Sequence, residues 1–475
     1  MEQPINKQNS MQVEENRKGS NRNLYLSSCA VLVGSICAGL VLGMSSPLIP
    51  AIQNDTSANA LTVSEKEAAW IGSILQLGAI PGGIVGGLMI QSLGRKRTAV
   101  LSGLPYVAGF MLISFATNVW MIYAGRFVNG CSLATTTLLV ATYISEISTK
   151  SLRGLLCSGG QLGITVGVFI IFAFGGIFTW RWMSFVVASF PVFMSIFCLF
   201  IPESPRYLLL KNTPKKAAKT LQMLRGEMAD ISGELCELKE AIELNSESSW
   251  KEIFLTPSLR IPFLLSLTLM FLQQTSGINC VTFFLGSIFQ SAGFTTKMEL
   301  LLPQLLMSGT QVIFTTISSC FMDRLGRKLL LSLSGSFMAV SAATFGAYFV
   351  LKENEGEFTW LAFTSVMVYI AAFSLGIGAV PWVFASETIP VRAKGKCGGS
   401  LSAFSSISAF VITSVFYDLQ NAITTQGTFW LFSGCCIVIV LFTIFLLPET
   451  KGKSLEEIER SYERKNAPHP NKINL

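Results

Sequence analysis

Long apolar segments recur along the whole chain, and this repetition limits the possible folds more than any other feature. Each holds about 20 residues, enough for a helix rising 1.5 Å per residue to cross a hydrocarbon core about 30 Å thick. Lipid offers the backbone no hydrogen-bond partner, so such segments must be helical. They lie near 25–47, 69–90, 98–116, 118–140, 155–178, 183–201, 261–285, 300–321, 329–351, 360–384, 399–417 and 428–447. The sequence therefore predicts an all-α membrane protein with twelve transmembrane helices.

A polar stretch separates the spans into two groups of six. We expect a cytosolic tail at 1–24, a six-helix half at 25–201, a cytosolic helical linker at 202–258, a second six-helix half at 259–448 and a cytosolic tail at 449–475. In the linker, Thr213-Pro214 predicts a helix start, because proline suits the first helical position. Mixed charges and an apolar stripe after it indicate short amphipathic helices.

The positions of the basic residues predict the orientation in the membrane. With both termini in the cytosol, only Lys66, Arg181, Lys297 and Lys352 lie in external loops, and Arg126 lies inside a span. This distribution is the positive-inside bias. The net charge of +7 therefore indicates attraction to anionic lipid, and we expect no nucleic-acid partner.

We expect no enzymatic activity, cofactor or metal site. Most of the eleven cysteines lie in spans without a metal-ligand spacing, so we interpret them as small packing residues. The single histidine, His469, lies in the tail, and no nucleophile, base and orienting residue recur together.

Three short cytosolic motifs occur in the same order in both halves. They are Leu93-Gly94-Arg95-Lys96 and Leu325-Gly326-Arg327-Lys328; Glu146 with Arg153-Gly154 and Glu387 with Lys394-Gly395; and Pro202-Glu203-Ser204 and Pro448-Glu449-Thr450. Such a parallel repeat is typical of transporters whose halves rock about a central binding site.

These and further motifs resemble those of the sugar porter family of the major facilitator superfamily. The further motifs are Gly125-Arg126, Tyr143-Ile144-Ser145-Glu146, Gln161-Leu162, Trp180-Arg181-Trp182, Pro205-Arg206, Gln273-Gln274-Thr275-Ser276-Gly277-Ile278-Asn279, Pro381-Trp382 and Lys451-Gly452. Within the family, the chain is most similar to insect facilitated trehalose transporters and animal glucose transporters. The resemblance implies the major facilitator fold and sugar transport across the plasma membrane by alternating access, with trehalose or a hexose such as glucose as substrate.

Uncharged amides in the spans are the candidates for sugar recognition. Gln and Asn both donate and accept hydrogen bonds, as sugar hydroxyls require. The resemblance implies that Gln161, Gln273, Gln274 and Asn279 line the site; the alternative is that such amides only join helices. Two further candidates are Gln311, where glucose transporters commonly have Asn, and Trp382, whose ring can stack on a pyranose.

We expect a break in span seven. On a regular helix, Gln273 and Asn279 would lie about 120° apart. Gly277 between them is a poor helix former, so a local break there would aim both amides at one ligand and let the outer half-helix move as a gate. A packing glycine is the alternative. In span ten, Pro381 predicts a bend. Ile377 and Ala379 stand where the family usually has two further prolines, which weakens the expectation of a flexible span ten.

The charged cytosolic motifs predict a latch between the halves that holds the outward-open state. Its members would be Arg95, Glu146, Arg153, Glu203 and Arg206 in the first half and Asp323, Arg327, Glu387, Lys394 and Glu449 in the second. Because exposed ion pairs contribute only about 0–1 kcal/mol each, simple membrane orientation of the loops is the alternative.

Three functions fit these patterns: a sugar uniporter, a proton-coupled symporter and a non-transporting sugar sensor. All 28 acidic residues lie in tails, loops or span ends, and Val41 stands where proton-coupled sugar porters carry Asp. Uniport is favoured because proton coupling needs a titratable group inside the membrane. The short tail after Lys451 argues against a sensor. The sequon Asn54-Asp55-Thr56 predicts glycosylation on the external side.

Overall fold

The regular structure of the protein is helical throughout its described part. The computed structural model describes residues 22–55, 61–149, 152–226, 228–243, 249–291, 293, 296–355 and 359–451, and no strand occurs within these ranges. Most of the two expected tails lies outside them.

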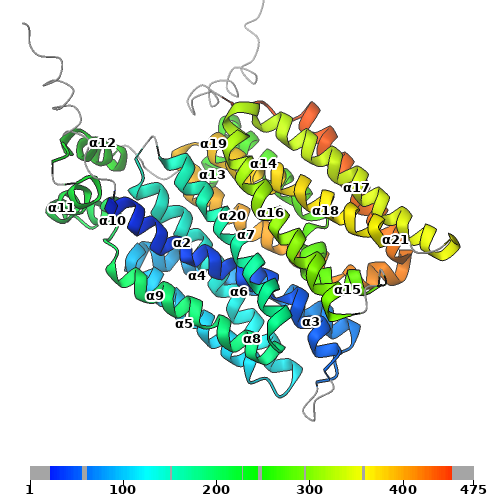
Figure 1. The fold of residues 1–475 in the computed structure, drawn as a ribbon. Coiled ribbons are helices and arrows are strands. Elements are labelled where there is room, and N and C mark those ends of the chain that lie inside the picture. Colours follow the sequence, from blue (N-terminus) through cyan, green and yellow to red (C-terminus); the bar gives the residue numbers. More distant parts are fainter. Residues whose placement is uncertain are drawn as a thin grey trace, which may run out of the picture.

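Twelve segments within the described ranges are long and apolar enough to cross a membrane (Figure 1). In the first half they are α2 (Arg22–Gly43) with α3 (Ser45–Gln53), α4 (Glu65–Leu93), α5 (Arg95–Ser114), α6 (Val119–Ile147), α7 (Arg153–Ile177) and α8 (Trp180–Val187) with α9 (Ser189–Phe200). In the second half they are α14 (Pro257–Thr275) with α15 (Ile278–Ser291), α16 (Lys297–Leu325), α17 (Arg327–Glu355), α18 (Thr359–Leu375) with α19 (Val380–Thr388), α20 (Val391–Ser414) and α21 (Phe416–Phe445). The prediction of twelve transmembrane helices is confirmed.

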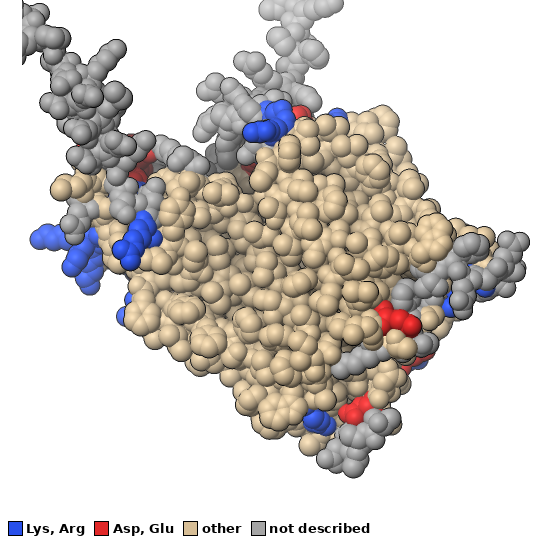
Figure 2. Space-filling view, in the orientation of Figure 1, with Lys and Arg blue, Asp and Glu red and all other residues tan. Residues whose placement is uncertain are grey.

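The surface agrees with a multi-pass membrane protein. Figure 2 shows charged side chains at two opposite ends of one face and a broad uncharged band between them. Large apolar side chains such as Ile84, Leu104 and Phe200 are exposed on the spans. In water such exposure would favour aggregation, whereas in lipid it is the expected outer surface.

Short helices form the linker between the halves. They are α10 (Pro205–Leu210), α11 (Pro214–Arg225), α12 (Ser232–Glu243) and α13 (Trp250–Leu255). Helix α11 begins at Pro214 as predicted, buries Ala217 and Leu221, and exposes Lys216. Helices α10 to α12 lie beyond one end of the first half (Figure 1).

Within the first half, glycines allow α4 and α6 to touch through their backbones. A Cβ atom at Gly78 would overlap the Phe127 carbonyl, one at Gly82 would overlap the Cys131 carbonyl, and one at Gly130 would overlap the Leu75 carbonyl. Small residues at this spacing permit close helix approach in membranes.

The two halves contact each other at the end of the molecule opposite the linker. There α3 of the first half packs on α15 of the second, and the Gly286 amide donates to Ser46 Oγ at 3.2 Å (Figure 1). In the same interface, the rings of Trp70 and Phe410 lie 5.9 Å apart. The halves are therefore in contact at this end.

Span ten is broken, although it lacks two prolines that are usual in the family. Helix α18 ends at Leu375, residues 376–379 form turns, and α19 begins at Val380 with Pro381 in its first turn. Pro381 has no N–H to donate to the Ile377 carbonyl four residues earlier. One proline, preceded by Gly376 and Gly378, is therefore enough to interrupt the helix without the family's two further prolines.

Candidate functional site

Span seven is interrupted where the sequence predicted. Helix α14 ends at Thr275, α15 begins at Ile278, and Gly277 between them has a φ of 85°. An L side chain is strained in this conformation, which glycine adopts readily. A Cβ at this position would also lie 2.5 Å from Cδ2 of Phe432. Gly277 therefore fits both the backbone turn and the close approach of α21.

Side chains from neighbouring spans secure this break. The Tyr369 hydroxyl donates to the Ser276 carbonyl at 2.5 Å, and Ser276 Oγ donates to the Gln273 carbonyl at 2.7 Å. Both side chains satisfy backbone oxygens that the interrupted helix leaves without its usual donors.

Two predicted amides meet at the break. Asn279 Nδ2 donates to Gln274 Oε1 at 2.6 Å, and Gln274 Nε2 donates to Ser405 Oγ on α20 at 2.9 Å. This connected set of neutral donors and acceptors is suited to exchanging partners with sugar hydroxyls. Ser405 was not predicted, because a serine in a span carries little signal by itself.

Gln273 has a different environment. Its Nε2 donates to the Ile377 carbonyl at 2.6 Å and to the Gly378 carbonyl at 3.1 Å. Pro381 deprives Ile377 of its helical donor, so Gln273 replaces that donor from span seven. In this structure Gln273 joins the broken spans seven and ten.

The other predicted binding residues lie on three further helices. Gln161 on α7 and Gln311 on α16 are half-buried, and these two helices pack together across the halves. Trp382 follows Pro381 on α19 and is 43% exposed. The candidate residues thus come from both halves, as a site between them requires.

Arg126 is a fully buried charge at the break of span one. Its guanidinium donates to the Val41 carbonyl at 2.7 Å, the Ile71 carbonyl at 3.1 Å and Ser45 Oγ at 2.5 Å. Val41 lies near the carboxyl end of α2, where the helix dipole favours a positive charge. Sequence reasoning placed Arg126 in a span but did not predict these partners, which come from three other helices.

The charged motif of the first half forms a compact cluster. Arg95 pairs with Glu146 through bonds of 2.6 and 2.9 Å, and Ser204 Oγ donates to the same carboxylate at 2.5 Å. The Arg95 amide donates to Glu203 at 2.9 Å. This cluster ties α5, α6 and the start of the linker together.

The second half repeats the arrangement. Arg327 pairs with Glu387 at 2.6 Å, and Thr450 Oγ1 donates to the same carboxylate at 2.7 Å. The Arg327 amide donates to Glu449 at 3.1 Å. Burial opposes ionisation of Glu449, but hydrogen bonds from the backbone of Lys451, Arg327, Lys328 and Thr450 hold its pKa below the ordinary value.

The two arginine–glutamate pairs each lie within one half, so the latch between the halves stays a prediction. Lys394 is exposed, and its Nζ donates to the Ser386 carbonyl of its own half at 3.0 Å. Arg206 is half-buried on α10. The side chains of Arg153 and Asp323 lie outside the described part of the structure.

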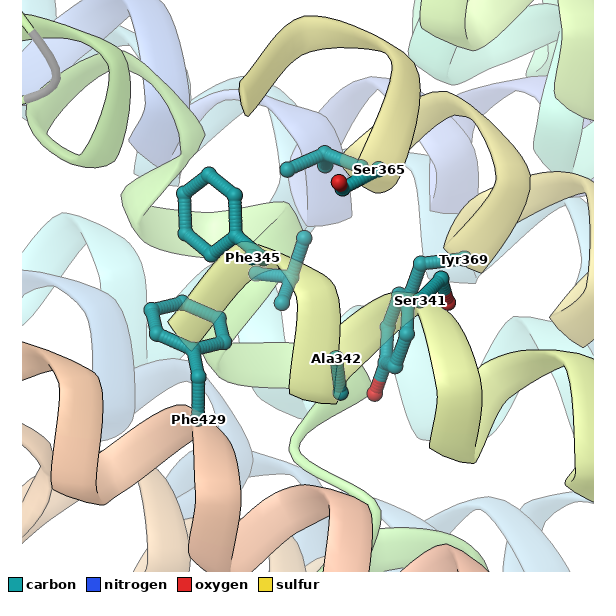
Figure 3. A pocket seen from close by; sticks show the side chains of 8 residues that line it. Ser341, Ala342, Phe345, Ser365, Tyr369 and Phe429 are labelled. Atoms are coloured by element: carbon teal, nitrogen blue, oxygen red, sulfur yellow. The ribbon is translucent and has the colours of Figure 1, made fainter. Parts of the chain in front are cut away.

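The second half contains a small cavity whose lining includes none of the candidate amides (Figure 3). Side chains including Phe345, Phe429 and Ser365 line it, and its volume is about 10 Å³. That is about the space that one water molecule needs, so the cavity cannot hold a sugar.

Twelve spans in two repeated halves, with helices broken beside buried polar side chains, define a transporter of the major facilitator class. A solved structure with this fold is the proton:xylose symporter XylE bound to 6-bromo-6-deoxy-D-glucose, with a TM-score of 0.78, 20% sequence identity, and coverage of 93% of this chain and 100% of that chain. At this identity the likeness concerns the fold alone.

Sequence comparison identifies the family. The family described as "Sugar (and other) transporter" matches residues 7–462. A facilitated trehalose transporter of Polypedilum vanderplanki is 35% identical over 441 residues, 92% of this chain and 87% of that protein. A facilitated glucose transporter of Bos taurus, solute carrier family 2 member 8, is 35% identical over 464 residues, 93% of this chain and 95% of that protein. The chain belongs to the sugar transporter family.

Proposed function

We propose that the protein moves a sugar, trehalose or a hexose such as glucose, across the plasma membrane down its concentration gradient. The main support is the neutral network of Asn279, Gln274 and Ser405 at the break of span seven. Such groups can bind hydroxyls without adding charge to the membrane interior. The relatives described as facilitated trehalose and glucose transporters support the same substrate class. A transporter of this kind performs no covalent chemistry, and we propose no enzymatic activity.

Removing single amides should weaken sugar binding. We expect Gln161→Ala and Asn279→Ala to raise the KM of uptake roughly 5- to 150-fold, because an unpaired buried hydroxyl costs about 1–3 kcal/mol. Gln273→Ala should also lower thermal stability, since the Ile377 carbonyl loses its 2.6 Å donor. Uptake of labelled trehalose and glucose into vesicles containing the purified protein measures the effect.

Gln53→Ala supplies the matched control, because this amide is exposed at the end of α3. Unchanged kinetics in all three site variants, with normal protein levels, would assign the amides to helix packing instead.

Transport should be uniport. The charge buried at the break of span one is Arg126. Its hydrogen-bond acceptors, the Val41 and Ile71 carbonyls and Ser45 Oγ, do not titrate near neutral pH. Val41 occupies the position at which proton-coupled sugar porters have Asp. We therefore expect both the empty and the loaded carrier to reorient without moving a proton.

The competing function is proton symport, as in the structural neighbour XylE. Vesicles with an imposed proton gradient and equal sugar on both sides distinguish the two functions. We expect no accumulation; sugar rising above its outside concentration, and falling when a protonophore is added, would establish symport. A sugar sensor would show binding without uptake.

We propose a plasma-membrane location with both termini in the cytosol. Asn54 is exposed just after α3, at the end opposite the linker, and Thr56 of its sequon lies outside the described residues. We expect a glycan at Asn54 in a eukaryotic host, detected as a mobility shift that Asn54→Gln abolishes. Epitopes at either terminus should be reached by antibody only after permeabilisation. Labelling of intact cells would reverse the orientation.

A further inference from the structure

One face of α16 is polar over several turns. Its members follow each other at intervals of four and three residues, so they share one side of the helix: they are Gln304, Ser308, Gln311, Thr315 and Ser318. Four of these side chains are buried, and that of Gln311 is half-buried. Exposed apolar side chains occupy the opposite face: Leu302, Leu306, Ile313 and Ile317. The polar face of α16 therefore points into the protein.

The amide of Gln304 on this face has no hydrogen-bond partner among the described residues. The residue is only 5% exposed. By contrast, the amides of Gln273 and Gln274 donate to carbonyl or hydroxyl oxygens of other spans. A buried amide without a partner destabilises a protein, because its hydrogen bonds to water have been lost and not replaced. The position of Gln304 therefore indicates binding of a polar group that the chain itself does not supply.

The Gln304 amide lies beside the contact between the halves. A Cβ atom at Gly286 would lie 3.1 Å from Gln304 Nε2, 2.6 Å from the Ser46 carbonyl oxygen and 2.8 Å from Cγ of Pro50. Gly286 on α15 thus lies between Gln304, which belongs to the same half, and α3, which belongs to the other half. Its amide also donates to Ser46 Oγ across the halves at 3.2 Å. In this arrangement, α3 therefore covers this part of the second half.

Gln304 and Gln311 are two helical turns apart. Seven residues at 1.5 Å each separate them by about 10 Å along the axis of α16. One pyranose ring is shorter than this distance, so a hexose bound at Gln311 does not reach Gln304. A disaccharide has two rings and can contact both amides.

We propose that Gln304 and the Gly286 amide form an outer subsite for the second ring of a disaccharide. This inference rests on the proposed function and adds the class of sugar. When the halves separate at this end, α3 leaves Gly286, and both polar groups become available to sugar hydroxyls. The Gly286 N–H donates, whereas the Gln304 amide both donates and accepts, as hydroxyl groups require. Gln304 thus favours a disaccharide such as trehalose over a hexose during uptake.

Uptake of two labelled sugars into vesicles tests the subsite. Gln304→Met keeps a side chain of similar length without the amide. We expect it to raise the KM for trehalose roughly 2- to 13-fold, the effect of losing one hydrogen bond, and to leave the KM for glucose unchanged. Gln311→Met should raise the KM for both sugars, because both bind at Gln311. An equal change for the two sugars in Gln304→Met, or no change for trehalose, would overturn the proposal.

Thermal unfolding of the purified protein separates binding from packing. Because the Gln304 amide has no partner among the described residues, Gln304→Met should not lower the unfolding temperature in the absence of sugar. Trehalose should stabilise the unmodified protein more than Gln304→Met, whereas glucose should stabilise both equally. A marked loss of stability without sugar would assign Gln304 to helix packing and contradict the proposal. Gln290→Met, which changes an exposed amide near the end of α15, is the matched control.

The same measurements distinguish failure of the subsite from failure of the proposed function. If the unmodified protein moves glucose but is neither inhibited by trehalose nor able to move it, the subsite is refuted and sugar transport stands. If the protein moves no sugar, the proposed function fails, and stabilisation by trehalose still tests Gln304. Equal stabilisation of the unmodified protein and Gln304→Met, or none in either, would then refute the subsite.

Discussion

Replacing Arg126 with leucine is expected to reduce sugar transport about 100-fold, the effect of losing about 2.7 kcal/mol. The guanidinium joins the end of α2, the start of α3 and the second turn of α4 through its bonds to Val41, Ser45 and Ile71. A single hydrogen bond to a charged group contributes about 1.5–3 kcal/mol, so the loss of one of these bonds accounts for an effect of this size. Leucine fills part of the space but leaves the carbonyls without this donor, so the break in span one loses its fixed geometry.

Stability should change much less than transport. A buried arginine costs about 2.5–3.5 kcal/mol in a membrane, and leucine removes this cost while also removing the hydrogen bonds. The two changes oppose each other, so we expect similar thermal unfolding for Arg126→Leu and the unmodified protein. Arg126→Lys keeps the charge without the planar fork and should be the less stable variant. Full transport by Arg126→Leu would show that the span-one contacts are dispensable.

Gly277→Ala is expected to destabilise the protein by about 2–6 kcal/mol and to abolish transport. The positive φ of this residue costs about 1–3 kcal/mol for alanine, and overpacking against Phe432 costs about 1–3 kcal/mol more. Thermal unfolding of the purified protein, together with vesicle uptake, measures both effects.

A double-mutant cycle separates the two costs. Adding Phe432→Leu to Gly277→Ala makes room for the new methyl group but leaves the backbone strain, so stability should return only in part. Gly434→Ala on α21 is the matched control, because a Cβ there meets nothing within 4 Å. A stable, active Gly277→Ala would mean that the break in span seven can straighten.

Local patterns in the sequence were sufficient for much of the fold. Apolar length predicted the spans, Pro214 predicted the start of α11, and Gly277 predicted the interruption of span seven. Each of these features depends either on the backbone conformation that a residue prefers or on the free energy of transferring its side chain from water to lipid. Neither requires knowledge of where other helices lie.

The contacts of the site could not be predicted in the same way. The two missing prolines weakened the expectation of a flexible span ten, although Pro381 alone removes the donor to Ile377. That Gln273 supplies the missing hydrogen bond, and that Ser405 joins Gln274, follows from the packing of spans more than 100 residues apart in the chain. The pattern of amides predicted which residues belong to the candidate site, but their hydrogen-bond partners depend on tertiary structure.

The backbone contact between α4 and α6 has a mechanical consequence. At Gly78, Gly82 and Gly130, the backbone of one helix touches carbonyl oxygens of the other helix. The two helices therefore cannot slide past each other without steric overlap. The α4–α6 pair must then tilt as one rigid unit, so a displacement at one end of the pair produces the opposite displacement at its other end. A rigid pair of this kind opens the path from the central site to one side of the membrane only while it closes the path to the other side. The site is then never open to both sides at once, which prevents uncontrolled flow of solutes during transport.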